Sequence, residues 1–139
     1  MNFEKLLNEK KIEKIEKTNF DINQLEKDLE FSRKSLEFNN YGWVMAITYE
    51  IVLKASNKLM NFLGYRSIGK EHHKNTFEFM NEIDIDTGLI TFFNKIRVKR
   101  NNFIYREADK VSKKEAEEII NKAEEFVRKI RTFVRKIRT

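Results

Sequence analysis

A cluster of polar side chains able to bind an anion lies in the segment 96–106. Four of them recur at steps of three and four residues, so they share a face if the segment is helical: Arg97, Arg100, Asn101 and Tyr105. Guanidinium groups bind phosphate oxygens, and amide and phenol groups add hydrogen bonds to nucleotides. The segment therefore predicts a nucleic-acid contact surface.

Arg100 is the residue of this face that most needs a partner. It lies four residues after Ile96 and three before Phe103, at the edge of an apolar stripe, which would place its guanidinium partly out of water. A cation removed from water requires an acceptor. Two acceptors remain open: an anionic ligand, or an acidic residue on the preceding long helix, such as Glu50.

The two histidines, His72 and His73, are adjacent in the sequence. Neighbouring side chains on a helix point about 100° apart, so the pair is poorly suited to chelate one metal ion. The chain has no cysteine, no phosphate-binding glycine loop and no Gly-x-Ser-x-Gly element. We therefore expect no metal site and no cofactor, and we interpret the histidines as packing against or capping a helix start.

The composition favours long helices. The 139 residues include no proline and only four glycines, while 40% of the residues are hydrophobic and 36% are charged. Turns in β-rich proteins use glycine and proline, so their scarcity argues against an all-β fold. The length predicts one domain over 1–139.

Apolar periodicity predicts an all-α, antiparallel bundle of five to six helices with a long antiparallel pair at its centre. The expected helices are 3–17, 21–36, 41–63, 73–83, 87–106 and 112 onward. No strand is expected, and 64–72 is expected to be a loop. The core of the bundle is expected over about 21–130, after a charged N-terminal helix within 1–20.

Local end signals support these boundaries. Gly64 follows the third helix, where a left-handed residue commonly ends a helix. Three capping patterns mark helix starts: Asp21 with Gln24, Asp86, and Ser112 with Glu115.

Basic charge is concentrated in the last third of the chain. The net charge is +6, but residues 95–139 alone carry 15 Lys and Arg against 7 Asp and Glu. This distribution fits an anionic partner such as nucleic acid, and equally a solvated helix face. No apolar run approaches 18 residues and no signal peptide is present, so we expect a cytoplasmic protein without a membrane partner.

The chain ends in a tandem repeat, because residues 126–132 recur unchanged as 133–139. A seven-residue repeat keeps Phe126 and Phe133 near one helix face and extends the last helix by two turns. The duplicated basic helical tail, 126–139, fits contact with a membrane surface or nucleic acid. The alternative is a duplication without a role.

The order of several short motifs resembles HEPN domains (higher eukaryote and prokaryote nucleotide-binding). The matching segments are 28–30, 39–43, 46–50, 54–55, 64–66, 71–73 and 100–105. Together they span about residues 21–130. The segments 64–66 and 71–73 resemble one prokaryotic branch of the family.

The resemblance implies a helical bundle that is commonly dimeric, with the motif helices of two protomers meeting at one site. Active members are metal-independent ribonucleases that use an arginine, four to six residues, and then a histidine. On that pattern Arg100 matches the arginine, Asn101 matches the polar residue after it, and Tyr105 stands where the histidine is expected. A tyrosine, with a pKa near 10, is a poor base at neutral pH, so the standard catalysis is weakened.

Three hypotheses follow from these features. We prefer a catalytically weakened HEPN-like domain that binds RNA or a nucleotide, or a nucleotidyltransferase-type protein, as a toxin–antitoxin or defence-type component. The second is a metal-independent endoribonuclease that uses Tyr105 or a recruited histidine. The third is a structural, partner-binding bundle. We also expect a homodimer, from the resemblance and from the apolar surface of Phe92, Phe93 and Phe103.

Overall fold

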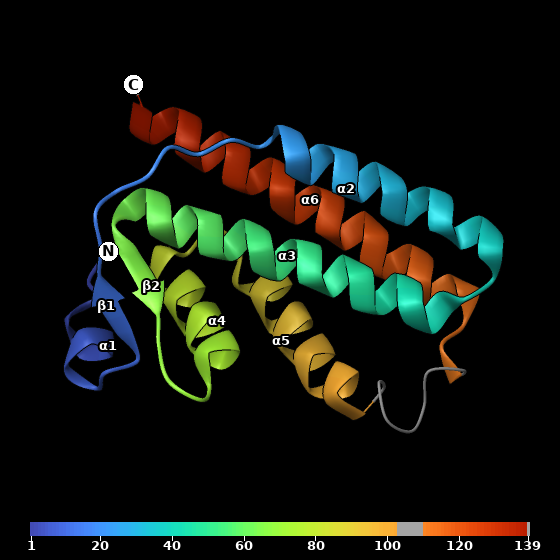
Figure 1. Ribbon diagram of the computed structural model, residues 1–139, viewed down its shortest axis with the longest axis horizontal. Helices are drawn as coiled ribbons and strands as arrows, with labels where there is room; N and C mark the ends of the chain where they lie inside the picture. Colours follow the sequence, from blue (N-terminus) through green and yellow to red (C-terminus); the bar gives the residue numbers. More distant parts are fainter. Residues whose placement is uncertain (103–109, 139) are drawn as a thin grey trace.

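A computed structural model of the chain describes residues 1–102 and 110–138 (Figure 1). The elements in chain order are α1 (Glu4–Asn8), β1 (Ile12–Lys14), α2 (Asn23–Lys34), the 3₁₀ helix η1 (Ser35–Phe38), α3 (Tyr41–Leu63), β2 (Tyr65–Ser67), α4 (His72–Ile83), α5 (Thr87–Asn102) and α6 (Lys113–Arg138). The prediction of an all-α bundle of five to six helices is confirmed, with one small two-stranded sheet added.

The two longest helices, α3 and α6, lie side by side at the centre of the bundle, and α2 packs along both (Figure 1). Arg138, at the end of α6, lies over the ring of Phe62, near the end of α3, at 5.6 Å from the ring centroid. The central pair is therefore parallel, and the expectation of an antiparallel central pair is wrong. The pair is parallel because α4 and α5 return the chain to the starting end of α3 before α6 begins. The helix that runs antiparallel to both is α2 (Figure 1).

Most predicted helix boundaries are confirmed, and their capping groups are in place. The Leu89 amide donates to Asp86 Oδ1 at 3.0 Å, and the Glu115 amide donates to Ser112 Oγ at 3.1 Å. Gly64 ends α3 with a φ of +95°, a conformation that strains any residue with a side chain.

The start of α2 differs from its predicted capping box. The helix begins after Ile22, which has no capping side-chain hydrogen bond. Asp21 Oδ1 accepts a hydrogen bond from the Asn23 amide at 2.9 Å and not from the Gln24 amide. The Gln24 side chain donates to Asp28 within the helix, at 2.9 Å. The predicted capping box is therefore not formed.

The prediction of one helix over 3–17 is wrong. The helix α1 ends at Asn8, and Lys10 then takes a left-handed conformation with a φ of +58°. The chain continues as β1, which pairs antiparallel with β2, Ile12 lying opposite Ser67. The pairing buries Ile12, and this long-range contact outweighs the local helical spacing. The predicted loop 64–72 therefore contains a strand.

The duplicated tail is part of the folded core. The helix α6 continues through the first copy of the repeat and through the second as far as Arg138, and Val134 of the second copy is buried. Arg138 also donates a hydrogen bond to the Phe20 carbonyl at 2.9 Å. The second copy therefore closes one end of the bundle, a role that neither interpretation of the tail included.

Candidate nucleic-acid interface

The helix α5 positions the arginines of the predicted contact face. Its apolar side packs into the core through Phe93 and Ile96, which leaves Arg97 and Arg100 at the flank of that side, both half-buried. Arg97 Nε donates to Asn94 Oδ1 at 2.9 Å, within the same helix. Asn101 lies in the last turn of α5, but its side chain, like all of Tyr105, lies outside the described residues.

Arg100 contacts an acidic residue of α3. Its Nη2 lies 2.5 Å from Glu50 Oε1, and its side chain is 20% exposed whereas that of Glu50 is 48% exposed. The guanidinium carbon lies 5.2 Å from the centroid of the Tyr49 ring, within the range of a cation–π interaction. Of the two acceptors that the sequence left open for Arg100, the structure contains the acidic one.

Hydrogen-bond donors exceed acceptors around Tyr49. Within the described part of the chain, neither the Tyr49 hydroxyl nor Arg100 Nε has a hydrogen-bond partner, although both are buried. Burial raises the pKa of Tyr49 to about 12, and the negative charge of Glu50 adds to the increase while Arg100 opposes it. The phenol is therefore protonated at neutral pH, and this part of the molecule favours ligands that accept hydrogen bonds.

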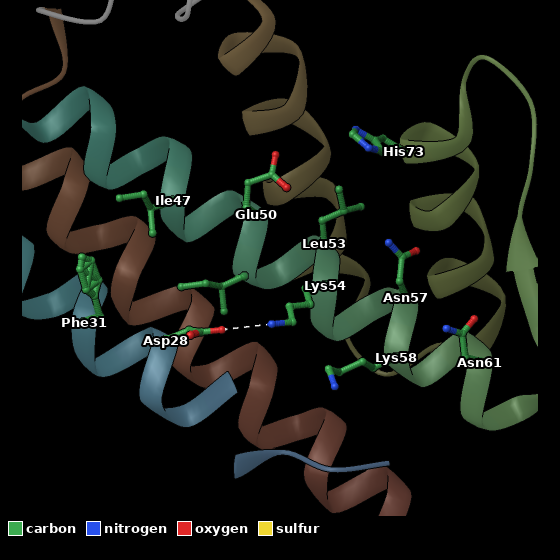
Figure 2. A pocket seen from close by; sticks show the side chains of 11 residues that line it. Asp28, Phe31, Ile47, Glu50, Leu53, Lys54, Asn57, Lys58, Asn61 and His73 are labelled. Atoms are coloured by element: carbon green, nitrogen blue, oxygen red, sulfur yellow. Dashed lines mark hydrogen bonds and ion pairs between the residues drawn. The ribbon is translucent and has the colours of Figure 1, made fainter. Parts of the chain in front are cut away.

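Sequence reasoning left open a recruited histidine at this site but did not identify it as His73. His73 lies in the first turn of α4, on the same helix face as the buried residues Phe77 and Met80, and it lines a groove together with Glu50 (Figure 2). The spacing of His73 and Phe77 could have indicated this position from the sequence, because a histidine four residues before a buried phenylalanine lies on the same helix face and points toward the neighbouring helix. The structure thus brings Glu50 of α3 and His73 of α4 to one place.

The imidazole of His73 is neutral at pH 7. Burial lowers its pKa below the usual 6.5, and the charges of His72, Arg100 and Arg97 lower it further, while Glu50 opposes them. His72 has a different environment, since its Nδ1 lies 3.1 Å from the Gly69 carbonyl oxygen. The side chains of the two adjacent histidines therefore lie in different environments.

The groove has a volume of about 730 Å³ and lies between α2 and α3 (Figure 2). Phe31 and Ile47 provide an apolar wall, while Lys54 and Lys58 project along it. Lys54 Nζ lies 3.5 Å from Asp28 Oδ2, a long and partly exposed ion pair. A groove with an apolar wall and cationic side chains is suited to a nucleotide, because the base can pack on the apolar wall while the phosphate pairs with the cations.

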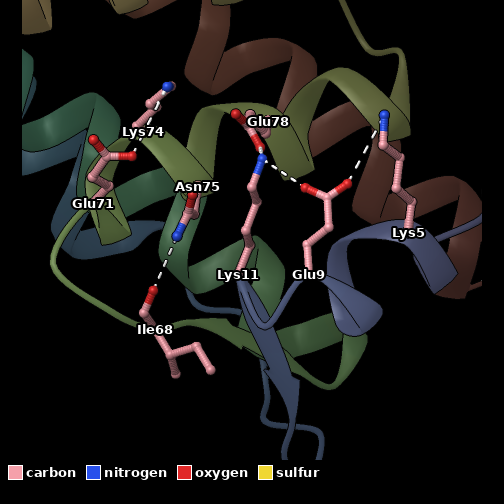
Figure 3. A network of polar contacts seen from close by, with 8 residues as sticks. All are labelled: Lys5, Glu9, Lys11, Ile68, Glu71, Lys74, Asn75 and Glu78. Carbon is pink, nitrogen blue, oxygen red and sulfur yellow. Dashed lines mark hydrogen bonds and ion pairs between the residues drawn. The ribbon is translucent and has the colours of Figure 1, made fainter.

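The N-terminal segment holds α4 in place (Figure 3). Lys11 Nζ donates to Glu78 Oε2 at 2.8 Å, and the Lys11 carbonyl accepts from the Ile68 amide at 3.0 Å. Asn75 Nδ2 then donates to the Ile68 carbonyl at 3.0 Å. The position of the first turn of α4 therefore depends on the sheet and on this network.

The predicted apolar surface is only partly described by the structure. Phe93 is buried within the bundle and Phe92 packs against its ring, so the expectation that these two residues form an outer apolar surface is wrong. The third residue, Phe103, lies outside the described residues. Among the residues that the structure describes, the exposed aromatic side chains are Phe31, Phe38 and Trp43, on α2, η1 and the start of α3.

In residues 1–102 and 110–138, no group of three or more His, Asp or Glu side chains is placed to hold a metal ion. Over the same ranges, no helix combines the length and the apolar character that a membrane crossing requires.

A comparison with family models identifies the chain. The model of the HEPN domain matches residues 19–133, most of the sequence. The chain belongs to the HEPN domain family. The resemblance seen in the sequence motifs is thereby confirmed, and membership supports a function related to nucleotides or RNA. No curated protein and no solved structure matches the chain significantly. The matched part of this HEPN domain includes Glu50, His73 and Arg100, whereas α1 and β1 precede it.

Proposed function

We propose that this HEPN domain binds RNA through the predicted contact residues Arg97, Arg100, Asn101 and Tyr105, of which the first three lie on α5. The observation that carries the proposal is the asymmetric ion pair between Arg100 and Glu50. Arg100 is held by the Tyr49 ring and largely covered, whereas Glu50 is half exposed. A phosphate oxygen can then replace the Glu50 carboxylate on a guanidinium that is already positioned.

The energetics favour a phosphate at this position. A hydrogen bond between a charged donor and a charged acceptor, partly shielded from water, contributes roughly 1.5–3 kcal/mol, equivalent to about ten- to hundredfold in affinity. Arg97 adds a second positive charge near the same place, because its charge, like that of Arg100, acts on both Tyr49 and His73. The net charge of residues 95–139 supplies a long-range attraction to the same ligand.

We further propose a cytoplasmic homodimer with weakened motif catalysis, since Tyr105 replaces the motif histidine. The exposed aromatic residues Phe31, Phe38 and Trp43 offer apolar surface of the kind that oligomers cover. A nucleotidyltransferase-type protein in a toxin–antitoxin or defence-type system is the alternative partner for the same surface.

The test is direct binding of a fluorescently labelled single-stranded RNA, followed by anisotropy at several salt concentrations, with light scattering to measure mass. We expect saturable binding, a log–log salt dependence with a slope of several, and the mass of a dimer. Absence of RNA binding at low salt would contradict the RNA proposal and favour the structural, partner-binding bundle. A monomeric mass across micromolar concentrations would contradict the homodimer.

The metal-independent endoribonuclease is the second candidate function. One observation favours it: His73, whose pKa is lowered by burial, lines the same groove as Glu50, the partner of Arg100, although it lies on a different helix from the motif.

A further inference from the structure

We propose that His73, supplied by α4 and not by the motif helix, is the general base of an RNA cleavage at this site. The inference rests on the proposed RNA binding at Arg100. To RNA binding, the inference adds cleavage of the bound RNA. The base for that cleavage lies outside the motif segment, because a tyrosine at position 105 is a poor base at neutral pH.

Three helices converge to form the proposed catalytic site. His73 projects from the first turn of α4 into the end of the groove where Glu50 of α3 lies (Figure 2). Glu50 in turn contacts Arg100 of α5 at 2.5 Å. Glu50 thus bridges the histidine side and the arginine side of the site. A phosphate that takes the place of Glu50 on Arg100 therefore faces the groove that His73 lines.

The helices that carry His73 and Arg100 both contact Tyr49. The ring of Phe77, one turn after His73 on α4, lies 6.1 Å from the ring of Tyr49. The guanidinium of Arg100, on α5, lies over the same ring. Because both helices pack against one buried tyrosine, the base and the phosphate-binding cation are carried by elements with a constant relative position, which proton transfer in a transition state requires.

The reaction is a transesterification that needs no further reactant. His73 accepts the proton of a ribose 2′-hydroxyl, and the 2′-oxygen forms a bond to the adjacent phosphorus. The bond between phosphorus and the 5′-oxygen breaks, and the 5′-oxygen leaves with the electron pair and takes a proton from water. The products are a 2′,3′-cyclic phosphate and a 5′-hydroxyl, and His73 returns its proton to water.

The charged groups around His73 agree with this role. Arg97 and Arg100 on α5 and His72 on α4 disfavour its protonation, and Glu50 on α3 favours it. The balance, together with burial, keeps the imidazole neutral and able to accept a proton at neutral pH.

The test uses the full chain, single-stranded RNA labelled at its 5′ end, and buffer with EDTA. His73→Gln is compared with wild type and with His72→Gln, a control of the same residue type on the same helix turn. We expect wild type to cleave the RNA to cyclic phosphate ends and to leave a 2′-deoxy substrate intact. We expect His73→Gln to cleave at least roughly a hundredfold more slowly while binding RNA within about twofold of wild type.

The pH profile separates a base from a structural residue. The wild-type rate should rise with pH, level off below pH 6.5 and stay flat above it, and the rise should be absent in His73→Gln. His72→Gln should retain the rise and a rate within about threefold of wild type. Thermal melting and a second variant, His73→Asn, exclude loss of the fold as the cause.

Two results would overturn the inference. Wild type that binds RNA without cleaving it would remove the reaction and leave the proposed binding intact. A His73→Gln variant that cleaves like wild type would assign the base to another residue. Wild type that neither binds nor cleaves RNA would contradict the proposed function itself, so the two failures are distinguishable.

Discussion

Arg100 and Glu50 form an ion pair between α5 and α3 in which the arginine is 20% exposed and the glutamate 48% exposed. The more buried member also rests on the Tyr49 ring. The glutamate therefore occupies, at a distance of 2.5 Å, the position that a ligand oxygen would take. It acts as an internal competitor of any anion that binds Arg100.

Removal of this competitor should strengthen RNA binding. We expect Glu50→Gln to raise affinity about threefold to tenfold, because the amide does not hold Arg100 as a carboxylate does and one negative charge is lost. Anisotropy with labelled RNA measures the change. Asp28→Asn is the matched control, since it removes the same charge from the same groove, where Asp28 pairs with Lys54 and not with Arg100. Equal gains in both variants would reduce the effect to overall charge.

Deletion of the second repeat should destabilise the bundle. Truncation after Thr132 removes the buried side chain of Val134 and the hydrogen bond from Arg138 to the Phe20 carbonyl. We expect the free energy of unfolding to fall by about 2–4 kcal/mol, measured by urea denaturation. Arg135→Gln, which removes an exposed charge of the same segment, should change it by less than about 0.5 kcal/mol. A truncated chain as stable as the full chain would restore the interpretation of the repeat as a duplication without a role.

The cap of α5 gives a prediction with a defined pH dependence. The hydrogen bond from Lys129 lowers the pKa of Asp86 below its usual 3.8, and the Leu89 amide lowers it further. A lowered pKa in the folded state stabilises the fold above the unfolded pKa, and that contribution is lost as the pH falls through the folded pKa. At pH 7, Asp86→Ala should cost about 1 kcal/mol. The difference from wild type should shrink below pH 3.8, and a cost that is independent of pH would contradict the assigned contacts.

His73 should make stability depend on pH in a higher range. Its pKa is lowered in the folded state, so below pH 6.5 the unfolded chain binds a proton that the folded chain does not. Stability should therefore decrease as the pH falls from about 7 toward the folded pKa, with no contribution from His73 above that range. His73→Gln should flatten this part of the profile, measured as urea midpoints between pH 5 and 8. A profile that is identical to that of wild type would contradict the burial of His73.

Features that depend on neighbouring residues were predictable from the sequence. The bounds of α3, its end at Gly64, and the caps of Asp86 and of Ser112 with Glu115 are all determined within one helical turn. The strands were not predictable, because Ile12 pairs with Ser67, far away in the sequence. Each strand has only three residues, too few to show a periodicity of two.

The same distinction applies to the candidate site. The pairing of Arg100 with Glu50 was one of two open alternatives, because helical spacing placed Arg100 at the edge of an apolar stripe, where it needs an acceptor, and Glu50 was a candidate acceptor on the preceding long helix. His73 was visible only as a residue near a helix start. Its position beside Glu50 depends on how α4 packs against α3, and that packing is determined by the small sheet and by Lys11 at its edge.

The most direct test of the central claim compares Arg100→Ala with Arg66→Ala in binding to labelled single-stranded RNA. Arg66 lies on β2, where its exposed guanidinium pairs with Glu13, and it serves as the matched control. We expect Arg100→Ala to weaken binding about ten- to hundredfold and to reduce the salt slope by about one, and Arg66→Ala to bind within about twofold of wild type. Thermal melting of each variant verifies the fold. An Arg100→Ala variant that melts and binds like wild type would contradict the claim that RNA is bound at Arg100.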